Sequence, residues 1–132
     1  GDYLQVASVM LMASTGNFTV TGDVLAFGTI SDRRLKENIN NINNGLETIN
    51  NLRPVTFNWK QDIFNEIRRG TSDSGFIAQE VESVIPHAVS QYTEIESKEI
   101  YKNMRHERII PYLVSAIKEL KQQVQELQER IN

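Results

Sequence analysis

The sequence contains no cysteine and only two histidines, His87 and His106. Without thiols the chain can form no disulfide, no thiolate nucleophile and no cysteine-based zinc site. Neither histidine stands in a metal-binding motif, and the carboxylates are scattered without a recurring ligand spacing. We therefore expect no metal ion and no other cofactor.

Long apolar runs and an excess of positive charge are also lacking. No run approaches the roughly 20 apolar residues of a membrane span, and the first residues lack the basic start of a signal peptide. The net charge is −3, whereas nucleic-acid-binding domains are usually strongly basic. We expect neither a membrane nor a nucleic acid as partner. The length of 132 residues allows one modest core or two small pieces.

Residues 1–30 have the composition of short strands. They are rich in Val, Phe, Thr and Leu, and Gly16, Gly22 and Gly28 recur at a regular interval. A pair of strands is only marginally stable in water. This segment is therefore expected to join a larger β structure or to pair with other chains.

Residues 31–108 are predicted to form a compact α+β domain. An apolar stripe with helical spacing begins it, and "NNG" in the middle is expected to split the helix in two. The stripe consists of Leu35, Ile39, Ile42, Leu46, Ile49 and Leu52. Residues 55–60 alternate as a half-buried strand, and 68–75 are expected to be a polar loop.

Later in this domain the expected elements are shorter. Residues 75–86 are predicted to run from a short strand into a helix that Pro86 stops. Residues 94–109 are too polar to assign beyond a hairpin or loop.

Residues 109–132 contain a short heptad repeat. Its apolar positions are Leu113, Ile117, Leu120, Val124, Leu127 and Ile131. A narrow stripe of this kind favours a self-associating coiled coil, although an amphipathic helix packed on its own domain stays an alternative. Ile and Val at a with Leu at d would by themselves favour two strands.

The stretch "GTISDRRLKENIN", residues 28–40, combines a serine with several charges. A serine hydroxyl becomes a nucleophile when a neutral lysine takes its proton. If Ser31 stands at the start of a helix, Lys36 lies one turn further and can fold back toward it. As a spacing alone the pair is common, however. The simpler interpretation is a cap formed by Ser31 or Asp32, followed by a solvated charge run.

Four motifs occur in a characteristic order. They are "SDRRLKENI", "LRPVTFNWK", "GFIAQEV" and "IIPYLVSAIKEL", the last leading into the heptads. Together they resemble the C-terminal intramolecular chaperone domain of phage tailspikes, tail fibres and neck appendages, best known from the endosialidase tailspike. The resemblance covers residues 31–132. Residues 1–30 share no motif with the family. They resemble it only in being strand-rich, as expected for the end of the trimeric β-helical fibre stalk that commonly precedes this domain.

The resemblance implies a homotrimer that assists folding of the stalk and then releases itself. Ser31 would be the nucleophile, Lys36 the base and Ile30–Ser31 the bond that is cut. Asp32, Arg34, Gln79 and Glu80 would be supporting motif residues, and residues 109–132 the trimer coiled coil. The stalk would stay in the phage virion, while the chaperone domain would be released into the host cytoplasm.

Two departures from the family pattern stand in this sequence. Many members carry tyrosine where His106 stands, and some carry histidine where Asp73 stands.

Two other functions also remain open. One is a permanent trimerisation or receptor-binding tip that is never cut. The other is the self-cleaving segment of a membrane-anchored transcription factor, which the strand-rich residues 1–30 disfavour.

Overall fold

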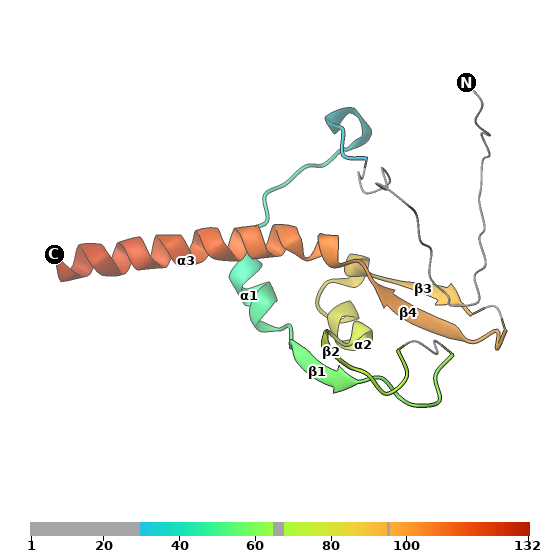
Figure 1. Cartoon of the computed structure of the whole chain (residues 1–132). Helices are drawn as coiled ribbons and strands as arrows, with labels where there is room; N and C mark the ends of the chain where they lie inside the picture. Colours follow the sequence, from blue (N-terminus) through green and yellow to red (C-terminus); the bar gives the residue numbers. More distant parts are fainter. Residues whose placement is uncertain (1–29, 65–67, 95) are drawn as a thin grey trace, which may run out of the picture. The chain divides into compact units, whose positions relative to one another are not determined.

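The computed structural model describes residues 30–64, 68–94 and 96–132. The strands predicted within residues 1–30 lie, except for Ile30, outside the described residues. The described chain divides into two units. One contains residues 30–37 and Asn58–Ser72, and the other contains Asn38–Phe57 and Asp73–Asn132. Small sheets, short helices and one long C-terminal helix confirm the α+β class (Figure 1).

The core lies in the larger unit, around helix α2 (Ala78–Glu82) and the turn after it. Val81 and Ile85 are almost completely buried, and Ala88 and Ile109 complete the cluster. The helix ends at Glu82, earlier than the stop predicted at Pro86. The backbone N–H groups of Val84 and Ile85 bond to the Val81 carbonyl, so a turn carries Ile85 into the core. Pro86 instead begins a short 3-10 helix, η2 (Pro86–Ala88).

The predicted strand at 55–60 is confirmed as β1 (Val55–Asn58), whose side chains alternate between half-buried and exposed. Its partner is β2 (Ser72–Gly75), so the prediction of a polar loop over residues 68–75 is wrong for 72–75 and holds for 68–71. The Ser72 hydroxyl donates to Asn58 Oδ1 over 2.8 Å. Polar residues suit β2 because one face of a two-stranded sheet stays in water.

The second sheet is an antiparallel hairpin of β3 (Val89–Thr93) and β4 (Ile100–Met104). Val89 lies opposite Met104, and both side chains pack on the core. The sequence allowed either a hairpin or a loop for residues 94–109. The structure contains a hairpin, whose second strand is β4. A 3-10 helix, η3 (His106–Arg108), follows β4 and leads into the last helix.

The helical stripe predicted between Leu35 and Leu52 is mostly wrong. Only a 3-10 turn, η1 (Arg33–Leu35), and a short helix, α1 (Gly45–Asn50), form there. Asparagine is a poor helix former because its amide competes for backbone groups. Asn40 donates in this way to the Asn38 carbonyl, over 2.9 Å, and Asn38 has a positive φ of 53°.

The predicted C-terminal helix is confirmed as α3 (Ile110–Ile131). Helix α1 packs on its N-terminal half (Figure 1). The Ser115 hydroxyl accepts from the Gly45 N–H over 3.2 Å and donates to the Ile42 carbonyl over 2.9 Å. Gly45 is buried at this contact, where a Cβ would stand 2.6 Å from the Ala116 nitrogen.

Candidate functional site

The junction after Ile30 is organised by Asp32, which caps η1. Its carboxylate accepts from the Arg34 backbone N–H over 2.8 Å. The Arg34 guanidinium closes on the same carboxylate through two bonds of 3.1 Å. These bonds from Arg34 hold the Asp32 pKa below its ordinary value, and Asp32 raises the Arg34 pKa. Of the two predicted caps, the structure therefore uses Asp32.

Ser31 is thus available for another partner, and its Oγ lies 2.6 Å from Lys36 Nζ. The lysine follows the single turn of η1 with an extended backbone, φ −122° and ψ 149°. Its backbone N–H closes the turn on the Arg33 carbonyl over 3.1 Å. The side chain is then placed to reach back over the turn. A hydroxyl and an amine at this distance can exchange a proton directly.

Ile30, Ser31 and Lys36 are all exposed in the described structure, Ile30 strongly so. A lysine amine acts as a base only in its neutral form, which desolvation or nearby cations favour. Arg34 is already paired with the Asp32 carboxylate over 3.1 Å. It is therefore not a free cation that could favour the neutral form of the lysine amine. Its observed contact is with the capping residue.

The other two supporting residues, Gln79 and Glu80, lie on α2 in the larger unit, whereas Ser31, Asp32, Arg34 and Lys36 belong to the smaller one. Glu80 accepts two hydrogen bonds from the Arg53 guanidinium, over 2.9 and 2.6 Å. Arg53 lowers the Glu80 pKa, mainly through these bonds. This bidentate pair joins the motif "LRPVTFNWK" to the motif "GFIAQEV".

Sequence reasoning missed Arg53. The available signal was its place directly before Pro54, inside a motif that was otherwise interpreted as a strand. Asp73, at the position where some family members carry histidine, accepts from the Ser74 N–H over 2.8 Å.

The heptad positions of α3 form an exposed apolar stripe. From Leu113 to Ile131 these side chains are 42% to 83% exposed. The contacts of α3 with α1 lie elsewhere on the helix, at Ser115, Ala116 and Glu119. Ile110, one heptad before Ile117, is 56% exposed and extends the stripe by one position that the sequence reasoning missed. In the described chain the stripe is therefore largely exposed along α3.

Within the described residues, no cluster of His, Asp and Glu side chains is suited to a metal ion. None of the helices described has both the length and the apolar character needed to cross a membrane.

Two curated relatives are long tail fibre proteins Gp37, from Enterobacteria phages K3 and T2. Each is 30% identical to this chain over 101 residues, or 76% of the chain. The chain spans only 8% of the first relative and 7% of the second.

A model of a protein family also matches, over residues 31–90. Its description is "Chaperone of endosialidase", and the family is classed as peptidase S74. The match begins at Ser31 and includes the first three of the four motifs on which the resemblance rests. Residues 31–90 of this chain therefore match the chaperone-of-endosialidase domain of the peptidase S74 family.

Proposed function

We propose that this chain is the C-terminal assembly domain of a phage tail fibre or related appendage, and that it cuts itself from the fibre at Ile30–Ser31. The 2.6 Å contact between Ser31 Oγ and Lys36 Nζ carries the proposal. The family description and the two tail fibre relatives support the setting, a virion component. The cut would leave the preceding stalk in the virion and release the domain.

The proposed chemistry begins when the Lys36 amine takes the proton of the Ser31 hydroxyl. The Oγ attacks the carbonyl carbon of Ile30 and forms a C–O bond. The C–N bond between Ile30 and Ser31 then breaks, and the Ser31 nitrogen receives the proton from Lys36. The result is an ester between Ile30 and Ser31 Oγ. Water hydrolyses that ester to an Ile30 carboxylate and restores the serine hydroxyl.

Asp32 and Arg34 are positioning residues in this scheme. By capping η1, the Asp32 carboxylate takes the role that the Ser31 hydroxyl would otherwise fill. Because Ser31 and Lys36 are exposed, we infer that assembly covers them and so favours the neutral amine. Cutting would then follow assembly, which is the order that a chaperone requires.

Self-association is the second half of the proposal. The exposed stripe on α3 is suited to a parallel coiled coil, and the family resemblance favours three chains. A coiled coil would raise the effective concentration of the preceding segments and hold them in register. Long-range strand pairing is slow because loop-closure entropy is lost before the contacts form. A trimeric coil would reduce that entropic cost.

The test is intact-mass spectrometry of the full chain beside Ser31→Ala, Lys36→Ala and Lys36→Arg. Arginine keeps the positive charge but cannot serve as a base. We expect a fragment of residues 31–132 from the unaltered chain and from none of the variants. Sedimentation equilibrium on the same samples should give a trimer. An uncut trimer would favour a permanent fibre tip, whereas a monomer or stable dimer would contradict the chaperone half.

A further inference from the structure

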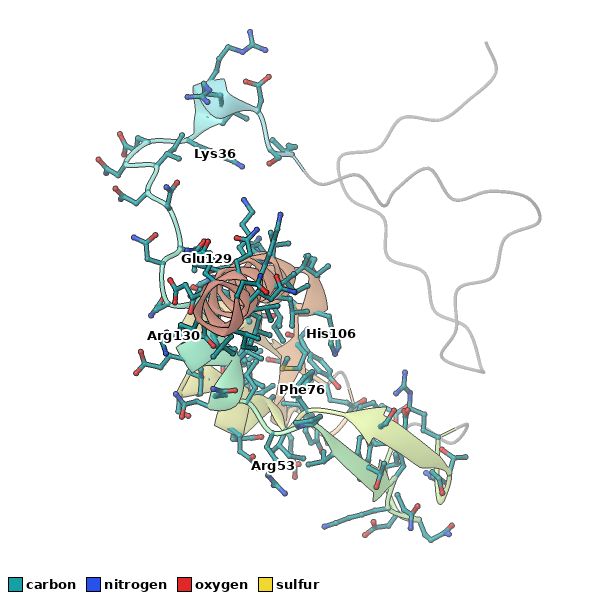
Figure 2. All side chains as sticks on the ribbon, turned by 90° about the vertical axis from the view of Figure 1, so that its left-hand side faces the viewer. Lys36, Arg53, Phe76, His106, Glu129 and Arg130 are labelled. Carbon is teal, nitrogen blue, oxygen red and sulfur yellow. The ribbon has the colours of Figure 1, made fainter. Side chains whose placement is uncertain are left out.

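An apolar groove of about 420 Å³ lies beside the start of α3. The end of α1 contributes Ile49 and Leu52 to its wall, and Phe76 and His106 also line it. Figure 2, which looks along α3, shows Phe76 and His106 on the same side of the helix. The start of α3 contributes Ile110 and Leu113, which also belong to the exposed stripe. The groove is therefore continuous with the heptad face.

The heptad register gives α3 two unlike flanks. With Ile110 at a and Leu113 at d, Ile109 and Ala116 occupy g positions, and Val114 occupies an e position. Ile109 and Ala116 are only 5% and 4% exposed. Val114 is 50% exposed. At the start of α3 the g positions are thus covered by the chain's own domain, beside the groove, whereas the e position holds the exposed apolar side chain of Val114.

In a parallel, in-register coil, the g residue of one helix faces the e residue of the next heptad in its neighbour. Here that rule sets Ile109, in the groove wall, opposite Val114 of a second copy. We propose that the groove accepts Val114 of a neighbouring copy of this chain, which makes the globular domain part of the assembly interface. This inference rests on the self-association proposed above.

The charges on α3 give the groove a specific role. Ion pairs between e and g positions usually set the orientation of coiled-coil partners. In α3 the e and g positions hold Lys121 and Arg130 but no acidic residue, so no such pair can form between copies. An antiparallel pairing centred on α3 would bring Lys121 toward Lys121 of its partner, and like charges facing each other across an interface are unfavourable. The contact of Val114 with the groove would instead fix a parallel register.

Site-specific photo-crosslinking tests the proposal on the full chain. A benzophenone amino acid replaces Val114, and equal amounts of ¹⁵N-labelled and unlabelled chains are mixed before illumination. We expect mass spectrometry to find links from position 114 to groove peptides of the other isotope, around Leu52, Phe76 or Ile109. The same probe at Lys118, on the b position, should give no groove link.

A trimer whose Val114 probe links only within its own chain, or to the C-terminal half of another α3, overturns the groove proposal and leaves self-association standing. A chain that is monomeric at every concentration overturns both. Sedimentation equilibrium of Val114→Asp gives a second readout, because a carboxylate without a partner in an apolar groove is unfavourable. Association should weaken by at least about tenfold, whereas Lys118→Asp should leave it nearly unchanged. Equal affinities for the two variants would refute the contact.

Discussion

Gly45 begins α1 at the point where this short helix touches α3. A Cβ there would collide with the Cβ and Oγ of Ser115 and would stand 2.6 Å from the Ala116 nitrogen. The last of these neighbours is backbone, which a rotamer change cannot move away. Gly45→Ala therefore forces α1 away from α3, or bends one of the two helices.

Two effects of opposite sign determine the size of the change. Alanine gains up to about 1 kcal/mol over glycine through helix propensity, and less at a first helical residue. Overpacking a filled contact costs about 1 to 3 kcal/mol. The steric term is the larger because the close neighbours include backbone. We expect Gly45→Ala to lower the free energy of unfolding by about 1 to 2 kcal/mol.

The assay is urea unfolding followed by circular dichroism, at one protein concentration because self-association also stabilises. Asn50→Ala, at the exposed end of the same helix, is the matched control. It tests helix propensity without a close contact and should be neutral or slightly stabilising. If Gly45→Ala were as stable as the unaltered chain or more so, the close approach of α1 and α3 would be refuted.

Three further predictions concern the core, the stripe and the junction. Ile85→Ala should lower the free energy of unfolding by about 2 to 5 kcal/mol in urea titrations, because the side chain is 1% exposed and its loss leaves a cavity. Leu120→Lys should abolish the proposed trimer in sedimentation while circular dichroism still reports a folded domain, since Leu120 is 46% exposed in the single chain. An NMR titration should place the Asp32 pKa below 3.8, and Arg34→Ala should raise it. Since folding lowers this pKa, the ion pair stabilises η1 above pH 3.8 and is lost as the pH falls through the lowered value.

The sequence predicted the elements whose periodicity is strong. The heptads of α3 extend over the whole helix, and the alternation of β1 matches its observed burial. In both cases the repeat of apolar side chains matches the repeat of the backbone, so the local pattern and the packing agree.

The failures have local causes. Between Leu35 and Gly45 the apolar spacing is helical, but the intervening asparagines compete for backbone hydrogen bonds, as at Asn40. Strand β2 has almost no apolar residues, so only its pairing with β1 identifies it. The repeat of apolar residues indicates which side of a helix or strand is buried. It does not indicate which strands pair with each other.

The candidate site was predictable in composition but not in contacts. The motif supplied Ser31 and Lys36, and the spacing allowed them to meet. Which of Ser31 and Asp32 would cap the turn could not be decided from sequence, because both are good capping residues. The pairing of Arg53 with Glu80 joins residues far apart in the chain, and a single sequence does not reveal it.

Trapping of the ester is the most direct test of the central claim, that Ser31 attacks the carbonyl of Ile30. The full chain is allowed to assemble in the presence of hydroxylamine, and the products are weighed by mass spectrometry. We predict an N-terminal fragment that ends in an Ile30 hydroxamate, together with a fragment that begins at Ser31. Ser31→Ala should yield neither. An assembled chain that keeps its Ile30–Ser31 bond, or a Ser31→Ala variant cut at the same bond, would contradict the account.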